Sequence, residues 1–156
     1  MTKKQPPGEI LVCRNPKATK AYEIEERLEA GMVLTGSEVK SLRARRADLE
    51  GAYGSISRGE VVLHKMHIAP YEHAGAFGHE PKRSRKLLMK RREIERWEGR
   101  LTTRGYTIVP LSVYFKNGYA KVELGLGKGR KLGDKREELK REVDLKEARA
   151  AIGKAR

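Results

Sequence analysis

The chain has 156 residues and a formal net charge of +14, from 35 Lys and Arg against 21 Asp and Glu. This length suits one compact domain with an appendage and does not suit two independent domains. The charge predicts a polyanionic partner, nucleic acid first, because each neutralised phosphate releases a condensed counterion. A membrane surface would attract the same charge, but the apolar run 10–13 is too short for a signal core or a span, so we expect a cytoplasmic protein. Cys13, the single cysteine, excludes an intrachain disulfide and a CxxC pair.

Composition divides the chain into three segments. Residues 1–8 carry lysines and prolines without apolar periodicity, and we expect them to be disordered. Residues 9–127 have apolar side chains at strand and helix spacing and form the predicted domain. Residues 128–156 contain eleven Lys or Arg and six Asp or Glu. Such a tail cannot bury a core of its own, and we expect it to become helical on binding.

The first predicted elements are a strand and a short helix. Apolar and charged residues alternate over 22–28, which is typical of a half-buried strand. A helix is predicted at 36–43, because Thr35 and Glu38 have the spacing of a capping box.

A hairpin and a basic segment come next. Residues 52–56 and 61–71 flank the turn signal at 58–60 and are predicted as two antiparallel strands. After a glycine-containing loop at 72–81, residues 82–104 carry ten basic residues against three acidic ones. A helix is predicted within that segment, since Ile94, Trp97 and Leu101 share one face, and Gly105 is its stop signal.

The clearest strand signal is the hairpin over 107–126. Apolar residues alternate on both sides of Asn117-Gly118, which is typical of a type I′ turn. Pro110 cannot donate a ladder hydrogen bond, so it is expected at an edge or a bulge. The outward face would carry Tyr114, Tyr119 and Lys121. Five or six strands with helices between them predict a mainly β fold: a small antiparallel OB-like β-barrel with inserted helices and a basic C-terminal tail.

Three other chemistries are not favoured by the sequence. The four histidines lack cysteine partners and metal-site spacing. The glycines at 125, 127 and 129 lack the Ser or Thr and the helix of a P-loop, so we interpret them as a flexible exit from the barrel. Glu25, Glu26 and Glu29 have no nucleophile or substrate pocket beside them. We therefore expect neither an enzyme nor a cofactor.

Basic residues and exposed aromatics together favour RNA. Charge runs are usually solvated faces, but the density over 82–104 is unusual, and tyrosines on the last hairpin can stack bases. The charge alone does not identify the RNA.

Several motifs in the same order resemble one bacterial family, the SsrA-binding proteins or small protein B family. They are Gly36-Ser37-Glu38-Val39-Lys40-Ser41-Leu42-Arg43, Tyr22-Glu23-Ile24-Glu25-Glu26 with Glu29-Ala30-Gly31, Arg85-Lys86-Leu87-Leu88, Gly105-Tyr106-Thr107, Tyr114-Phe115-Lys116-Asn117, Lys128-Gly129-Arg130-Lys131 and Asp134-Lys135-Arg136. The resemblance implies a barrel that binds the tRNA-like domain of transfer-messenger RNA. It also implies delivery to stalled ribosomes for trans-translation, with a tail that probes the decoding centre and the empty mRNA channel of the small subunit. Elongation factor Tu is expected in the same complex.

The resemblance also implies roles for individual residues. Glu29, Leu88 and Lys121 correspond to the family's RNA-contacting positions, and we add the RNA-binding candidates Arg85, Lys86, Arg92, Tyr22 and Lys20. The expected ribosome-contacting tail residues are Lys128, Arg130, Lys131, Asp134, Lys135, Arg136 and Ile152. Two positions depart from the family pattern: Gly133 stands where Tyr or His is usual, and Lys20 replaces a common His.

Two alternatives to this adaptor remain open. One is a general RNA-binding protein on an OB-fold, such as a ribosomal protein or an RNA chaperone. The other is a nuclease, which would need a metal cluster or a His/Lys/Glu centre that the sequence does not indicate.

Overall fold

The structure, a computed structural model, describes residues 9–71 and 78–130. The first elements in chain order are β1 (Glu9–Arg14), α1 (Pro16–Ala21), β2 (Tyr22–Met32), α2 (Gly36–Arg43), β3 (Ala47–Asp48), β4 (Tyr53–Ser57) and β5 (Glu60–His64). They are followed by β6 (His67–Ile68), β7 (Arg85–Leu88), α3 (Arg91–Leu101), β8 (Tyr106–Lys116) and β9 (Tyr119–Gly129).

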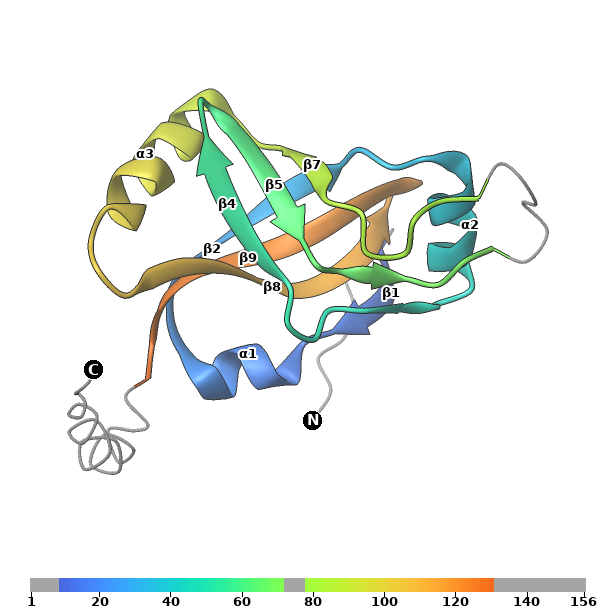
Figure 1. Cartoon of the computed structure of the whole chain (residues 1–156), viewed down its shortest axis with the longest axis horizontal. Helices are drawn as coiled ribbons and strands as arrows, with labels where there is room; N and C mark the ends of the chain where they lie inside the picture. Colours follow the sequence, from blue (N-terminus) through green and yellow to red (C-terminus); the bar gives the residue numbers. More distant parts are fainter. Residues whose placement is uncertain (1–8, 72–77, 131–156) are drawn as a thin grey trace.

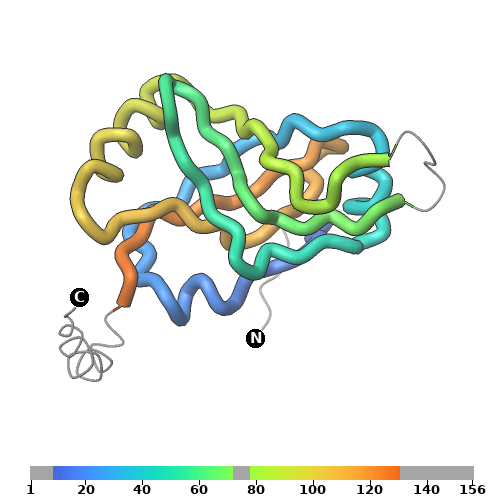
Figure 2. The backbone as a smooth tube through the Cα atoms, viewed as in Figure 1, coloured from blue at the N-terminus to red at the C-terminus, as the bar shows by residue number. Residues whose placement is uncertain are grey.

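The predicted barrel is confirmed as a mainly β, antiparallel fold with a closed ring of strands. The sheet has the order β1-β8-β4-β5-β7-β2-β9, and a further pairing of β8 with β9 closes it, so that β1 lies outside the ring on β8. α2 and α3 lie at opposite ends of the barrel (Figure 1). The backbone trace shows β4, β5 and β7 passing across the β2–β9–β8 layer (Figure 2).

The core fills the space that the ring encloses. Trp97 from α3 and Leu42 from α2 are fully buried at its two ends. Between them lie alternate side chains of the strands, among them Val61, Leu63, Leu87, Ile108, Val113, Val122, Leu124 and Leu126. Burial of these side chains provides the main stabilisation of the barrel.

Local backbone rules account for the turns and the bulge. Asn117 and Gly118 have φ of 51° and 86°, and Arg58 and Gly59 have φ of 54° and 77°, as type I′ hairpin turns require. The pairing of β8 with β9 shifts register just after Pro110, so of the two predicted positions for this proline, an edge or a bulge, the structure has the bulge.

One secondary-structure prediction is wrong, and one strand was not predicted. The strand predicted at 61–71 ends at His64, because Lys65 adopts a φ of 66° and the chain then leaves the barrel to form β6, which pairs with β3. The strand that was not predicted is β7, which fills the gap between β5 and β2. The helix predicted within 82–104 is confirmed as α3. Lys86 and Leu88 point outward from β7, and Arg85 and Leu87 point inward.

The glycines of β9 are not a flexible exit. A Cβ on Gly127 would lie 2.7 Å from the carbonyl oxygen of Glu23, and a Cβ on Gly125 would lie 3.0 Å from Ile24. These glycines therefore allow β2 and β9 to approach closely. The strand continues to Gly129, two residues beyond the boundary predicted at Gly127. The segment predicted as disordered, 1–8, lies outside the described residues, as does nearly all of the predicted tail.

Candidate nucleic-acid interface

Four neighbouring strands place the central candidate residues in one row. Gly31 of β2 pairs with Leu88 of β7 on one side and with Lys121 of β9 on the other. Lys121 in turn pairs with Tyr114 of β8. Residues directly opposite in neighbouring strands point to the same face, so the row presents an apolar side chain, a glycine, an ammonium group and a phenol. Two residues before Gly31 on β2, Glu29 points to the same face.

Gly31 leaves a hollow in the middle of this row. A Cβ there would lie 3.6 Å from the Cβ of Leu88 and 3.9 Å from the Nζ of Lys121. The pocket that results has a volume of about 500 Å³. It is lined by Glu29, Gly31, Leu88, Met89, Lys90, Glu93 and Lys121. We call it the Glu29 pocket.

Glu29 is held by three side chains from the last hairpin. Tyr114 donates its hydroxyl proton to Oε1 over 2.9 Å, and the Nζ of Lys116 lies 3.3 Å from the same oxygen. The Nζ of Lys121 lies 3.8 Å from Oε2. Partial burial and the Glu29 carboxylate both raise the pKa of Tyr114, so the phenol stays a hydrogen-bond donor at neutral pH. The carboxylate is thus oriented beside two cations.

Leu88 is the exposed apolar part of this surface. Its side chain is 55% exposed, although leucine is among the residues most often buried. Lys86, its neighbour on the outer face of β7, is also exposed and lies 3.6 Å from Glu60. Arg92 is exposed on the first turn of α3.

Arg85 is not on this surface, and the prediction that it binds RNA is wrong. Its side chain is fully buried, and its Nε donates to Glu38 over 2.7 Å. The guanidinium also donates to the carbonyl oxygens of Met66 and Pro81, at 2.7 and 3.0 Å. A guanidinium with these partners cannot reach a phosphate.

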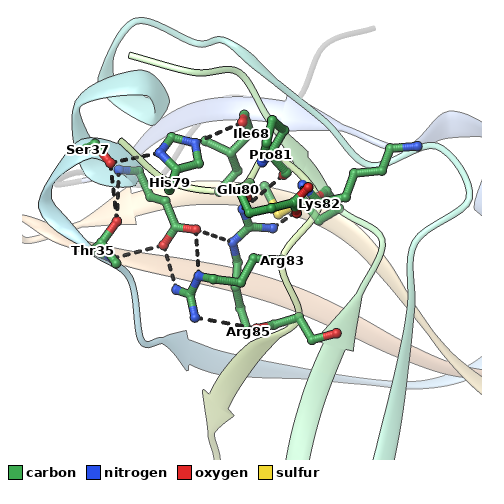
Figure 3. Close-up of polar contacts among 12 residues, drawn as sticks. Thr35, Ser37, Ile68, His79, Glu80, Pro81, Lys82, Arg83 and Arg85 are labelled. Carbon is green, nitrogen blue, oxygen red and sulfur yellow. Dashed lines mark hydrogen bonds and ion pairs between the residues drawn. The ribbon is translucent and has the colours of Figure 1, made fainter. Parts of the chain in front are cut away.

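Glu38 is the centre of a polar network that connects α2 with β7. Figure 3 shows Thr35, Arg83 and Arg85 converging on this site. The predicted capping box is confirmed, since Glu38 accepts from the backbone N–H of Thr35 over 2.9 Å. Arg83 adds two hydrogen bonds to the carboxylate, at 2.7 and 3.1 Å. Beside it, His79 bridges Ser37 and the carbonyl oxygen of Ile68. The network fixes the segment that enters β7 and so supports Leu88.

A second set of polar contacts fixes α3 on β2. Glu26 accepts from the indole N–H of Trp97 over 3.0 Å and pairs with Arg96. One turn further along the helix, Arg100 donates to Glu25 over 2.7 Å. These contacts hold the rest of the helix against the barrel, while its N-terminal Lys90 and Glu93 line the Glu29 pocket.

The remaining candidates lie at the other end of β2. Tyr22 pairs with Gly129 at the end of β9, and Lys20 is exposed on α1 just before it. Lys128 is exposed, and the guanidinium of Arg130 donates to the carbonyl oxygen of Thr19 at 3.2 and 3.3 Å. The structure therefore separates these four residues from the Glu29 pocket. The other tail candidates, Lys131, Asp134, Lys135, Arg136 and Ile152, lie outside the described residues.

Two lysines of this surface were not predicted. Lys116 is two positions from Tyr114 on β8, and this period-2 spacing could have indicated that both side chains share a face with Lys121. Lys90 precedes the first residue of α3, and no local signal indicates that it faces β2.

The described residues contain no group of three His, Cys, Asp or Glu side chains that could hold a metal ion. Among the helices of 9–71 and 78–130, none is long and apolar enough to cross a membrane. A closed β-barrel with lysines, a positioned carboxylate and an exposed leucine around one pocket defines a small OB-like protein with a surface suited to unpaired RNA.

Comparisons with known proteins identify the family. The model of the SmpB protein family matches residues 12–154. An SsrA-binding protein of Geobacter metallireducens is 52% identical over 145 residues, which cover 93% of this chain and 95% of the relative. An SsrA-binding protein of Bacillus subtilis is 51% identical over 145 residues, 93% of this chain and 92% of the relative. The chain belongs to the SmpB family.

A solved structure agrees with this assignment. A chain described under the words "tmRNA-SmpB: a journey to the center of the bacterial ribosome" superposes with a TM-score of 0.68 and 44% sequence identity. The match covers 84% of this chain and 93% of that one.

Proposed function

We propose that this protein is a non-enzymatic RNA-binding adaptor of trans-translation. It binds the tRNA-like domain of transfer-messenger RNA and delivers that RNA to stalled ribosomes. Its SmpB family membership, the names of its relatives and the ribosome-complex neighbour support this function. The observation that carries it is the Glu29 pocket, where Leu88, Gly31 and Lys121 lie in register across three strands.

Each group at the pocket has a distinct task in the proposed complex. Lys121 neutralises a backbone phosphate, which positions the RNA without reading its sequence. The Glu29 oxygens accept from the N–H groups of an unpaired base edge, and Tyr114 and Lys116 orient the carboxylate. Leu88 packs against an exposed base or ribose.

The other candidates extend this surface. Lys86 and Arg92 add phosphate contacts on the same side, and Lys20 and Tyr22 contact RNA at the far end of β2. The tail residues contact the small-subunit decoding centre and the mRNA channel, in a complex that also holds elongation factor Tu. The adaptor acts in the cytoplasm, where ribosomes translate mRNA.

Co-purification of RNA tests the adaptor against its alternative. We expect the tagged wild-type protein to recover one transfer-messenger RNA species, and Lys121→Glu to lose it while keeping the wild-type circular dichroism spectrum. Recovery of mixed ribosomal and messenger RNA would instead support a general RNA-binding OB-fold protein.

Deletion of the tail tests whether the barrel alone binds the RNA and the tail is needed for tagging. Because β9 runs to Gly129 and Arg130 bonds to Thr19, the truncation should remove 131–156 and keep these residues. The truncated protein should bind the tRNA-like domain in a gel shift but fail to support tagging on ribosomes stalled at an mRNA end. Normal tagging would refute the proposed role of the tail.

A further inference from the structure

The outer face of β7 borders two pockets. Beside the Glu29 pocket lies a second pocket of about 530 Å³ between the β4–β5 turn, β7 and α3. Leu88 and Met89 line both. The exposed Leu88 side chain therefore forms a partition between two neighbouring hollows.

The second pocket has both cationic and anionic side chains around an apolar wall. We call it the Arg58 pocket, after the residue at the tip of the β4–β5 turn. Its cations are Arg58, Lys86 and Arg91, its carboxylates belong to Glu60, Glu95 and Glu98, and its apolar wall comes from Val61, Leu87, Leu88, Met89 and Ile94. The Nζ of Lys86 lies 3.6 Å from a carboxylate oxygen of Glu60, and the Nε of Arg91 lies 3.6 Å from one of Glu95. The exposed Arg58 has no such partner among the described residues.

We propose that the Arg58 pocket is a second nucleotide site and that Leu88 is a wedge between two successive unpaired nucleotides of the bound RNA. This inference rests on the proposed function and extends it by one nucleotide. One base enters the Glu29 pocket, the next enters the Arg58 pocket, and Leu88 separates them. Lys121 and Arg58 bind the backbone phosphates at the two rims.

The chemistry of the pocket favours unpaired RNA over an apolar ligand. Base edges carry both donors and acceptors, and the carboxylates and cations of the lining match both. The apolar wall suits the face of a base, and the unpaired Arg58 guanidinium suits a phosphate. Paired bases in an A-form helix are stacked, so a leucine can separate two bases only where the strand is already single.

Variants at the rim test the proposal by affinity. Arg58→Ala should weaken binding to the tRNA-like domain about threefold and lower the slope of log K against log salt by about 0.7, the value for one single-strand phosphate contact. The matched control is Lys65→Ala, at the opposite end of β5. Lys65 is exposed and, like Arg58, has a positive φ. The control should bind as wild type does. An Arg58→Ala variant with wild-type affinity and slope would overturn the second site.

Cross-linking tests the wedge directly. Lys90 lines the Glu29 pocket, and Arg91 lines the Arg58 pocket. A photoreactive benzophenone side chain at each position, in the full-length protein bound to the tRNA-like domain, should cross-link to adjacent nucleotides. Cross-links far apart in the RNA, or none from position 91, would overturn the proposal while position 90 still reports on the Glu29 pocket. If wild-type protein does not bind this RNA at all, the proposed function fails instead.

Discussion

Replacement of Glu38 by Gln should strongly destabilise the barrel. The carboxylate receives hydrogen bonds from Arg83, from Arg85 and from the backbone N–H of Thr35, and both Glu38 and Arg85 are fully buried. A glutamine keeps the shape but removes the charge and turns an NH₂ group toward guanidinium donors. Loss of one partner leaves a buried charge uncompensated, which costs about 3–5 kcal/mol. For a domain whose total stability is about 5–15 kcal/mol, that is a large fraction.

The pH dependence of stability gives a second measure of what the Glu38 carboxylate contributes to the free energy of unfolding. Burial alone would raise the pKa of Glu38, but hydrogen bonds from Arg83, Thr35 and Arg85 outweigh it and lower this pKa from 4.5 to about 2. The displacement corresponds to about 3 kcal/mol. Because the folded pKa lies below the unfolded one, this stabilisation is fully present above pH 4.5 and is lost as the pH falls toward 2.

Urea denaturation across pH measures both quantities. At pH 7, Glu38→Gln should lower the free energy of unfolding by several kcal/mol, and its stability should fall less steeply between pH 4.5 and 2 than that of the wild type. The control is Glu50→Gln, which breaks the exposed ion pair with Lys17 and should leave both measurements close to wild type. A Glu38→Gln protein as stable as the Glu50→Gln control would refute the role of the network.

Three further variants probe the RNA surface and the close contact of β2 with β9. Tyr114→Phe removes the hydrogen bond to Glu29 and should weaken RNA binding by about 0.5–1.5 kcal/mol in a gel shift, with an unchanged circular dichroism spectrum. Gly31→Leu should fill the Glu29 pocket and weaken binding about tenfold or more, while thermal unfolding still shows a folded protein. Gly127→Ala should lower the free energy of unfolding by about 1–3 kcal/mol in urea, because its Cβ would meet a β2 carbonyl, and Gly129→Ala, which has open space, should not.

Local patterns predicted the parts of the fold that local physics determines. The type I′ turn at Asn117-Gly118, the capping box of Thr35 and Glu38, and the bulge at Pro110 depend on residues within a few positions of one another. Backbone conformations there are limited by glycine, proline or a side-chain cap, so few alternatives compete. The barrel as a whole was predicted from five or six expected strands with helices between them.

Interactions between distant segments were not predictable in this way. β7 has only four residues and places the charged Arg85 inward, so its pattern does not read as a strand with an apolar inner face. The partner that allows this burial, Glu38, is 47 positions away in the sequence. The alignment of Leu88, Gly31 and Lys121 likewise depends on the register of three strands, which the sequence does not specify directly.

The buried Arg85 and the exposed Leu88 lie on opposite faces of the same short strand, β7. A four-residue strand has few ladder hydrogen bonds, so its register needs another determinant. A slip by one residue would turn Arg85 out and Lys86 and Leu88 in, and would remove the buried guanidinium from Glu38. That penalty favours the observed register, in which Leu88 lies beside Gly31. An apolar pair could stabilise the core as well. The network at Glu38 therefore determines where the proposed RNA contact at Leu88 can form.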